Sequence, residues 1–463
     1  MVARILIGLT VCIASHFVNA NSYVFPAPAG GANPVVTLHD EQSLSGLQRK
    51  NIEVLIKDTY HTLDSANKTS ALSLINESYE GKLPAWLYNA IQRCEKWFKK
   101  TEGNISCRNG ALYNYWGEYV RGTHDLSRRE VRRLARAARI AEVKFTDNFG
   151  IKFSPPLQWD LSEYAASLAI ERVVDYLTSL NFTSFHISAQ GLETHVSNEG
   201  ISWHGDIAQE PAVQKNGTIA YIQPWQRPVI SNGKIASVEK GVLSQSDGWP
   251  SAKFQAVSVA PNAFDAMLIA HFAVSKPAQH ALDLVNTNAL TALKLIDENG
   301  RVFTSDSYTS HTSQLSKDDP YLMSVDIVLP LFNIADYRGP YVSVWISDEK
   351  NHLIKSLALR GTSERWLSEL RTWWRRVGRQ NEGLVDGFAG ATKKNAPLHI
   401  EWDGLDDFGK NSNAQSLILH IEVAREHGGR SYEKIPFTFD SLTSPITVTG
   451  ADEIASITLS LMN

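Results

Sequence analysis

Hydrophobic positions in the first two thirds of the chain mostly follow a helical period. Apolar residues three and four apart predict helices over 44–63, 83–100, 161–180 and 262–274, and a further helix that begins at Asp125. Shorter apolar runs predict strands at 143–145, 184–188, 218–223 and 254–260. The segments 293–296 and 302–303 flank Glu298-Asn299-Gly300, which is typical of a hairpin turn. This part is therefore expected to be α+β, with a mixed or antiparallel sheet.

From about residue 320 the pattern changes to alternating strands. They are predicted at 321–328, 341–346, 352–359, 399–402, 416–423 and 434–439. One helix interrupts them over 363–376, with Ser363 or Thr362 as its N-cap. Short strands with turn signals between them favour a β-sandwich with one inserted helix. Ser, Thr, Lys and Asp cluster around 310–322, which places the domain boundary there.

The N-terminus is predicted to be a targeting segment. Arg4 precedes an apolar run over 5–13, and Val18-Asn19-Ala20 has small residues where a signal peptidase needs them. We expect a signal peptide over 1–20, cleaved after Ala20, and a periplasmic or secreted mature chain without a transmembrane segment. A loose lead-in over 21–44 is expected, rich in Pro, Gly and Ala up to about residue 40. Two domains follow, at 45–315 and 322–445.

Net charge and cysteine content limit what kind of protein this can be. The net charge of -4 over 463 residues provides no basic field for nucleic acid. A run of arginines over 128–139 is expected to be a solvated helix face, with anion or lipid-surface binding as the alternative. Cys94 and Cys107 remain in the mature chain. An oxidising compartment would let them pair, and two buried free thiols are the alternative.

Three segments resemble the ApbE family of FAD:protein FMN transferases. Residues 70–76 read Ser-Ala-Leu-Ser-Leu-Ile-Asn, 160–169 read Asp-Leu-Ser-Glu-Tyr-Ala-Ala-Ser-Leu-Ala, and 258–266 read Ser-Val-Ala-Pro-Asn-Ala-Phe-Asp-Ala. The resemblance covers 45–305 and implies a T-fold-type α/β domain. It also implies an extracytoplasmic enzyme that uses FAD and Mg²⁺ to transfer FMN to a hydroxyl. Asp265 matches a metal-binding carboxylate of the family, and a helix N-cap or a solvated charge is the alternative role.

The departures from the family pattern fall on the chemistry. Ser162-Glu163 stand where the family has Gly-Gly, Ala166 stands for its Lys, and Ile269 stands for a metal-binding Thr. Its Gly-Gly-Asp turn corresponds to Ala189-Gln190-Gly191, and the stretch before Gly248 lacks its Ser-His-x-x-Asp-Pro segment. An aliphatic side chain cannot supply the oxygen that Mg²⁺ requires. We therefore expect this domain to be inactive as a transferase.

The C-terminal region resembles a family of predicted periplasmic proteins that often follows ApbE-like regions, and this resemblance implies an immunoglobulin-like (Ig-like) sandwich. Its landmarks include 344–346 (Val-Trp-Ile), 373–375 (Trp-Trp-Arg) and 402–409 (Trp-Asp-Gly-Leu-Asp-Asp-Phe-Gly). The last of these is expected to be a β-turn, because Asp and Gly favour turns. A calcium site built from Asp403, Asp406 and Asp407 is the alternative.

One loop in this region resembles the acceptor motif of FMN transferases, Asp-Gly-x-Ser/Thr-Gly-Ala-Thr/Ser. Residues 386–392 read Asp-Gly-Phe-Ala-Gly-Ala-Thr and depart from it only at Ala389. The resemblance implies FMN bound covalently through its phosphate to Thr392, with Asp386, Gly387, Gly390 and Ala391 shaping the loop. An ordinary glycine loop is the alternative. Trp373 and Trp374 would be either a wall for the flavin ring or core packing.

Three functions remain open at this point. The first is a periplasmic flavin-bearing protein in electron transfer, modified by a separate flavin transferase and paired with a membrane flavin reductase or cytochrome. The second is an active Mg²⁺-dependent FAD:protein FMN transferase. The third is a non-enzymatic periplasmic binding module. They differ in whether flavin is bound and which protein attaches it.

Overall fold

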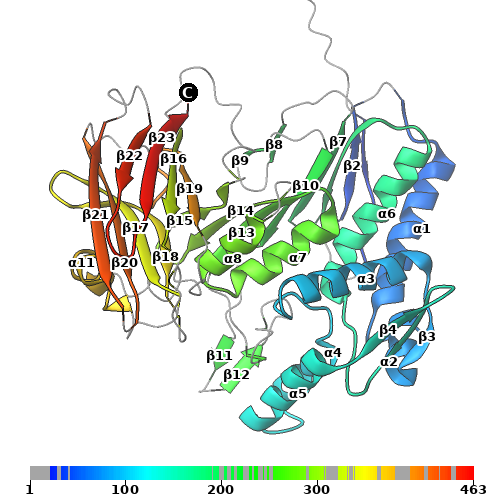
Figure 1. Cartoon of the computed structure of the whole chain (residues 1–463). Helices are drawn as coiled ribbons and strands as arrows, with labels where there is room; N and C mark the ends of the chain where they lie inside the picture. Colours follow the sequence, from blue (N-terminus) through cyan, green and yellow to red (C-terminus); the bar gives the residue numbers. More distant parts are fainter. Residues whose placement is uncertain are drawn as a thin grey trace, which may run out of the picture.

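The computed structural model folds into an α+β region followed by a region of two stacked sheets (Figure 1). It describes residues 21–28, 33–39, 42–189, 191–197, 254–287, 291–306, 322–330, 339–361, 367–380, 397–410, 416–426, 428–438 and 445–462, with shorter stretches between 203 and 249 and a few single positions. The predicted signal peptide lies outside the described residues. Among the helices that the structure describes, none is long and apolar enough to span a bilayer.

An eight-stranded antiparallel sheet forms the centre of the first region, in the order β1-β2-β6-β7-β10-β13-β14-β15. The strands are β1 (Asn21–Val24), β2 (Val35–Leu38), β6 (Ser184–Ala189), β7 (Leu192–Ser197), β10 (Asn216–Ile222), β13 (Phe254–Ala260), β14 (Ala292–Asp297) and β15 (Val302–Thr304). Alternate residues of β6, such as Phe185 and Ile187, are buried in one large core. Helices α1 (Gly46–Leu63), α6 (Ala165–Ser179) and α7 (Ala263–Val274) contribute to the same core and lie on the sheet face visible in Figure 1.

The lead-in predicted over 21–44 is not loose throughout. Val35–Leu38 pairs with β6 and Asn21–Val24 pairs with β2, so both belong to the central sheet. Val36 and Leu38 are almost fully buried. These strands escaped prediction because each is only four residues long and lies beside Pro, Gly and Ala. Their stability comes from long-range pairing, which local pattern does not report.

A smaller helical layer lies below the sheet in Figure 1. It contains α2 (Ala71–Ser78), α3 (Ala85–Lys100), α4 (Gly110–Val120) and α5 (Arg128–Ile140), together with the short sheet β3 (Glu80–Lys82), β5 (Gly150–Phe153) and β4 (Val143–Thr146). Helix α4 was not predicted from the sequence. Cys94 in α3 forms a disulfide with Cys107, with their Cα atoms 5.9 Å apart, which decides the open question of these cysteines.

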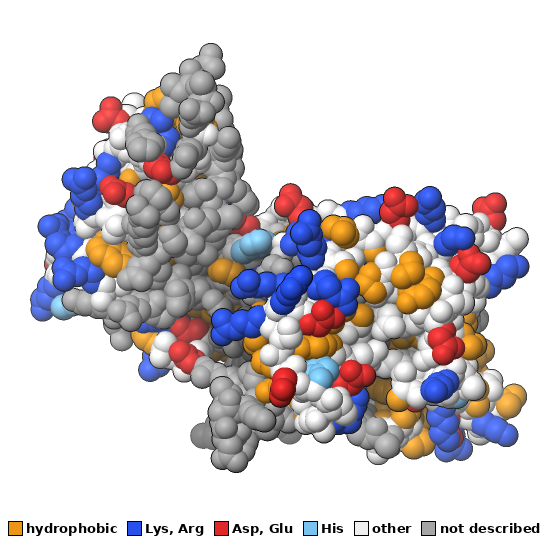
Figure 2. All heavy atoms as spheres, turned by 90° about the horizontal axis from the view of Figure 1, so that it is seen from below, with side chains coloured by type: hydrophobic (Ala, Val, Ile, Leu, Met, Phe, Trp, Pro, Cys, Tyr) orange, Lys and Arg blue, Asp and Glu red, His pale blue; other side chains and the backbone are white. Residues whose placement is uncertain are grey.

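The arginines of α5 form a solvated face, as predicted. Arg129, Arg132 and Arg136 are exposed, while Val131 and Leu134 on the opposite side pack against α4. Figure 2 shows Lys and Arg side chains gathered on the underside of the molecule, the side on which α4 and α5 lie in Figure 1.

The C-terminal region is a sandwich of two four-stranded sheets, β19-β16-β23-β22 and β18-β17-β20-β21. Its strands are β16 (Leu322–Val328), β17 (Tyr341–Asp348), β18 (Leu353–Arg360), β19 (Leu398–Trp402), β20 (Leu417–Ala424), β21 (Arg430–Phe437), β22 (Ile446–Thr449) and β23 (Ser456–Met462). Residues facing inward from both sheets form a second core. Strands β22 and β23 were not predicted. Of the helix predicted over 363–376, the structure describes α11 (Arg371–Arg376), and both proposed N-caps lie outside the described residues.

The turn after β19 connects the two regions. Asp407 is buried and accepts hydrogen bonds from the backbone N–H and hydroxyl of Ser356 at 2.8 and 3.3 Å. The carbonyl of Asp407 accepts a hydrogen bond from the N–H of Val302 in β15. Lys355 donates to the carbonyl of Val302 at 2.9 Å. The predicted turn is confirmed, because the carbonyl of Asp406 accepts from the N–H of Gly409 at 3.1 Å. Within the described part of the chain its carboxylates form no metal-binding group.

Candidate functional site

The three segments that resemble the transferase family come together in the structure. Asn76 at the end of the first segment donates to the carbonyl of Trp159 and accepts from its N–H, at 2.8 and 2.7 Å. Trp159 directly precedes the second segment, which continues into the 3₁₀ turn η1 (Ser162–Tyr164) and α6. Tyr164 then packs edge-on against Phe264 of the third segment, with ring centroids 5.3 Å apart.

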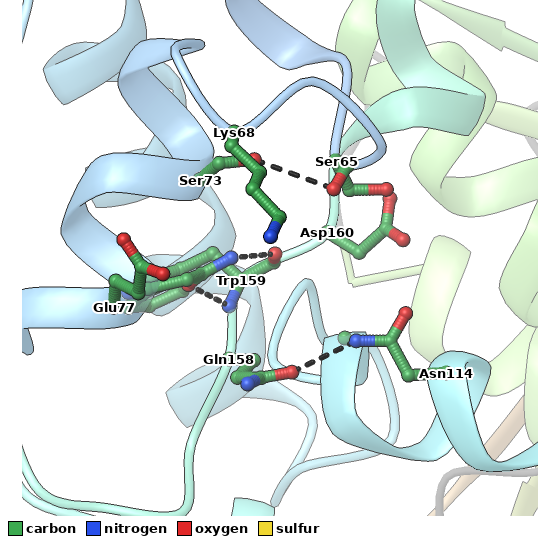
Figure 3. Close-up of a pocket in the computed structure, with 10 residues that line it drawn as sticks. Ser65, Lys68, Ser73, Glu77, Asn114, Gln158, Trp159 and Asp160 are labelled. Carbon is green, nitrogen blue, oxygen red and sulfur yellow. Dashed lines mark hydrogen bonds between the residues drawn. The ribbon is translucent and has the colours of Figure 1, made fainter.

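A polar cavity of about 170 Å³ lies where the first two segments meet (Figure 3). Its lining residues are Ser65, Lys68, Ser73, Asn76, Glu77, Gly110, Asn114, Gln158, Trp159 and Asp160. The ammonium group of Lys68 extends toward Trp159 and Asp160. Pockets for drug-sized ligands are usually about 300–1,000 Å³, so this cavity can take a small polar group but not a flavin ring.

Asp160 fixes the start of the second segment. Its Oδ1 accepts hydrogen bonds from the backbone N–H and the hydroxyl of Ser162, at 2.9 and 2.6 Å. Burial, followed by the negative charges of Glu163 and Asp160, raises the pKa of Tyr164. Ser162 also lines a separate cavity of about 530 Å³, together with Ala165, Tyr60 and His61. That cavity lies within the usual size range for small-ligand sites.

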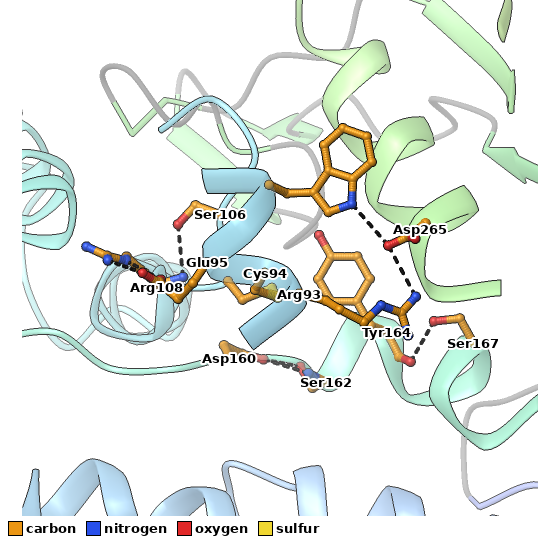
Figure 4. Close-up of a disulfide and its surroundings, with 12 residues drawn as sticks. Arg93, Cys94, Glu95, Ser106, Arg108, Asp160, Ser162, Tyr164, Ser167 and Asp265 are labelled. Atoms are coloured by element: carbon orange, nitrogen blue, oxygen red, sulfur yellow. Dashed lines mark hydrogen bonds and ion pairs between the residues drawn. A yellow bond between two sulfur atoms is a disulfide. The ribbon is translucent and has the colours of Figure 1, made fainter. Parts of the chain in front are cut away.

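Asp265 lies in the first turn of α7, whose N-cap is Asn262. Its Oδ1 accepts from Trp97 Nε1 at 3.0 Å and lies 3.1 Å from a terminal nitrogen of Arg93. Its Oδ2 accepts from the side-chain amide of Asn262 at 2.9 Å. Figure 4 shows Arg93 reaching from α3 to this carboxylate.

Glu171 of α6 completes the cluster. It forms a two-pronged ion pair with Arg93, with N–O distances of 2.7 and 3.1 Å. Its Oε1 also accepts from the N–H of Phe264 at 2.9 Å, so it satisfies a free donor at the start of α7. Burial lowers the pKa of Arg93, but the bonds and charges of Glu171 and Asp265 outweigh this and raise it. The cluster therefore ties α3, α6 and α7 together.

These contacts do not fit a magnesium site. Both oxygens of Asp265 already accept from N–H donors, and Arg93 places a cation beside them. Ile269, one turn further along α7, is completely buried and has no donor oxygen. Among the described residues, no group of three His, Cys, Asp or Glu side chains is arranged to hold a metal. A metal role for Asp265 stays a prediction, and it requires the Arg93 contact to give way.

Gly191 lies in the turn where the family has Gly-Gly-Asp, and its backbone conformation and surroundings require a glycine. Its φ is +76°, and a Cβ there would lie 2.6 Å from the carbonyl oxygen of Tyr221. The neighbouring Gln190 lies outside the described residues.

The acceptor-like loop of Asp386, Gly387, Gly390, Ala391 and Thr392 also lies outside the described residues, so its role stays a prediction. The chain enters it after the 3₁₀ turn η3 (Gly378–Gln380) and leaves it before β19. Trp373 is buried at 1% exposure, which confirms core packing for this residue. Trp374 is only partly buried and can still face a ligand.

Sequence reasoning missed Arg93, Trp97 and Glu171. All three lie on helices as isolated polar or aromatic positions, and no motif marks them. Arg93 and Asp265 are far apart in sequence, and only the packing of α3 against α7 brings them together.

Comparisons with known proteins agree with this fold. The ApbE family model matches residues 33–294, and a model described as "Predicted periplasmic protein (DUF2271)" matches 322–456. Two flavin transferase structures are similar: a point mutant of ApbE from Vibrio cholerae (17% identity, TM-score 0.53) and apo ApbE from Pseudomonas stutzeri (14%, 0.53). The matches span 100% and 98% of these two structures, respectively, and 63% and 64% of this chain.

An ApbE protein from Thermotoga maritima is similar at 17% identity and a TM-score of 0.52, with 63% of this chain and 99% of that one covered. The search of curated proteins gave no significant match. At these identities the structural likeness establishes the fold and leaves the activity open. The family match spans more than half of the chain, and the chain therefore belongs to the ApbE family, with a C-terminal domain of the predicted periplasmic type.

Proposed function

We propose that this protein is an extracytoplasmic flavin-associated protein whose ApbE-type domain does not catalyse Mg²⁺-dependent FMN transfer. Its C-terminal domain would carry FMN covalently on Thr392 and serve in electron transfer. A separate flavin transferase would attach the flavin, and a membrane flavin reductase or cytochrome would exchange electrons with it. The predicted periplasmic type of the C-terminal domain supports this location.

The observation that carries the proposal is the environment of Asp265. Transfer of a phosphoryl-linked group depends on a metal that neutralises phosphate charge. Here the carboxylate pairs with Arg93, and the next position on that helix face is the buried Ile269. Adding a Mg²⁺ ion would require removal of a guanidinium and two further N–H donors from one carboxylate.

The carrier role of Thr392 rests on the acceptor-like sequence and on what precedes it. Arg375 and Arg379 are exposed at the end of α11 and η3, just before the loop. Their guanidinium groups can pair with phosphate oxygens in two-pronged fashion. Trp374 is partly buried and packs against the core.

An active transferase is the second candidate. Its support is the match of this chain to the full length of the Vibrio cholerae flavin transferase structure. In that case FAD and Mg²⁺ would be needed. The Oγ of Thr392, or of a target protein, would displace AMP from the pyrophosphate of FAD, leaving FMN joined by a phosphodiester.

Expression with and without a competent flavin transferase tests the proposal. We expect protein-bound flavin fluorescence after denaturation, and a mass increase of one FMN, only with the helper. Thr392→Ala should abolish both, whereas Thr438→Ala, just after β21, should not. An adduct formed by the purified protein with FAD and Mg²⁺ alone would establish the second candidate. If no adduct forms in any of these cases, the remaining function is a non-enzymatic periplasmic binding module.

A further inference from the structure

Helix α5 concentrates positive charge on one face. Its 13 residues include six arginines and one glutamate, a net charge of +5 in a chain whose total is -4. Arg129, Arg132, Arg133, Arg136 and Ile140 follow one another at intervals of three or four, so they project from the same side of the helix. We call these five residues the arginine face of α5. Figure 2 shows the basic side chains on this side of the molecule.

The opposite side of α5 is already occupied. Val131 and Leu134 pack with Leu112 and Trp116 of α4 in a buried cluster of their own. A helix that lies in a membrane interface on its own buries its apolar side there. In this protein the apolar side holds α5 against α4, so the arginine face is a fixed outer surface of the folded domain.

Little of the positive charge is neutralised within the protein. Glu130 pairs with Arg133 at 2.6 Å. Arg129, Arg132 and Arg136 are exposed, and none of them forms an ion pair with a residue that the structure describes. Like charges three or four positions apart destabilise a helix. The arrangement therefore costs stability, and an anionic partner outside the chain would offset that cost.

Ile140 indicates what kind of partner this is. It ends the arginine face and is 71% exposed. A soluble anion would gain nothing from an aliphatic side chain beside the arginines. At a lipid surface, guanidinium groups can bind phosphates in two-pronged fashion while an aliphatic side chain enters the boundary between headgroups and acyl chains.

We propose that the arginine face of α5 docks the ApbE-type domain on an anionic phospholipid surface. Each basic residue close to such a surface strengthens binding by about fivefold. The inference rests on the proposed function only for the extracytoplasmic location, which the predicted periplasmic type of the C-terminal domain supports and which argues against a nucleic acid as the partner. It goes beyond that function because it involves no flavin.

Sedimentation with vesicles tests the proposal. The protein is purified after export, and loss of the predicted signal peptide is verified by mass, so that this segment does not itself bind lipid. The protein should bind vesicles that contain phosphatidylglycerol and should not bind vesicles of phosphatidylcholine alone. Binding should weaken steeply with salt, because the screening length falls from about 10 Å at 0.1 M to about 3 Å at 1 M.

Glutamine variants assign the binding to α5. Arg129→Gln, Arg132→Gln and Arg136→Gln combined should weaken binding by about 100-fold, at about fivefold for each arginine. Glutamine favours helix and removes like-charge repulsion, so the melting temperature should be unchanged or higher. Arg132→Gln alone should weaken binding by about fivefold and serves if the combined variant does not fold.

Two controls separate this face from general charge effects. Arg49→Gln, Lys50→Gln and Lys57→Gln combined remove the same charge from exposed positions of α1, and should leave binding within about fivefold of the wild type. Ile140→Asn removes apolar contact without removing charge. It should weaken binding and leave the dependence on salt unchanged.

Three results would overturn the inference. The wild type might fail to bind phosphatidylglycerol vesicles at low salt, or the folded triple variant of α5 could bind them as tightly as the wild type. Binding of polyglutamate without binding of vesicles would assign the arginine face to an acidic protein instead. None of these readouts involves flavin, so their failure is distinguishable from failure of the FMN adduct experiment.

Discussion

Two clusters in this molecule place a carboxylate at the start of a helix and pair it with an arginine. In the C-terminal domain, Glu422 accepts from the N–H groups of Thr372 and Trp373 in α11, at 2.9 and 2.7 Å, and pairs with Arg430. In the N-terminal domain, Glu171 accepts from Phe264 in α7 and pairs with Arg93, but Asp265 is added. The first cluster is balanced in charge and the second has a carboxylate in surplus.

The two clusters also differ in how far water reaches them. Glu422 is fully buried, and it accepts hydrogen bonds from Thr372, Trp373 and Arg430, whose donors would otherwise lose water without replacement. The Arg93 cluster is partly solvated and borders a cavity. Lost contacts should therefore be costly at Glu422, whereas water can partly replace those of the Arg93 cluster.

The largest expected effect is at the balanced cluster. Glu422→Ala leaves Arg430 and the first N–H groups of α11 without their acceptor, so we expect a loss of about 3–5 kcal/mol in the free energy of unfolding. Denaturant unfolding measures this, with Glu349→Ala in an exposed turn as the control. A loss similar to that of the control would show that Glu422 does not hold α11.

Removal of the disulfide should affect only the unbalanced cluster. Cys94 is next to Arg93 on α3, and its bridge to Cys107 closes a loop of 13 residues. Replacing both cysteines with alanine should cost about 3 kcal/mol of stability. Hydrogen exchange should speed up at the start of α7 and stay unchanged at the start of α11. Equal acceleration in both places would contradict the separation of the two clusters.

Acidification should weaken the C-terminal domain through His420, which is two residues from Glu422 on β20. Burial, and then the positive charges of Arg376 and Lys434, lower the pKa of His420 to about 4. Its unfolded pKa is about 6.5, so its stabilising contribution is complete above that pH and is lost as pH falls toward about 4.

Between pH 6.5 and pH 5 the loss from His420 should amount to about 2 kcal/mol, at about 1.4 kcal/mol per unit. Denaturant unfolding at several pH values measures it, and His420→Asn should flatten the dependence. The Nε2 atom of His420 is 2.8 Å from the hydroxyl oxygen of Ser347, and its Nδ1 atom is 2.7 Å from that of Tyr432. The amide of an asparagine can form part of these hydrogen bonds. An unchanged pH dependence in the variant would assign the effect to other groups.

The smallest effect is expected at Glu171. Glu171→Gln keeps an acceptor for Phe264, and Arg93 still has Asp265, so the cost should be about 1 kcal/mol. The same unfolding measurement applies, with Glu422→Gln as the matched change in the balanced cluster. If both glutamine variants cost the same, the surplus carboxylate has no compensating role.

The sequence predicted most helices and strands because their apolar period is strong, as in α3, α6 and β13. It missed β2 and β23, which pair with strands distant in the chain, and β1 and β22, which are edge strands of four residues each. At the site, resemblance led to Asp265 and to the loss of a donor at Ile269. It could not lead to Arg93, because an arginine on an amphipathic helix looks the same whether it faces water or a carboxylate. The loop of Thr392 remains a sequence prediction.

The position of β23 also bears on how the C-terminal domain acquires its fold. This strand pairs with β16 from Leu322↔Met462 to Val328↔Ser456, so the first and last strands of the domain lie side by side inside one sheet. Loop closure over such a span must precede the gain from pairing, which makes this step slow. Until it occurs, β16 has an open edge that could recruit another chain. A domain closed in this way depends on its last strand for protection against aggregation.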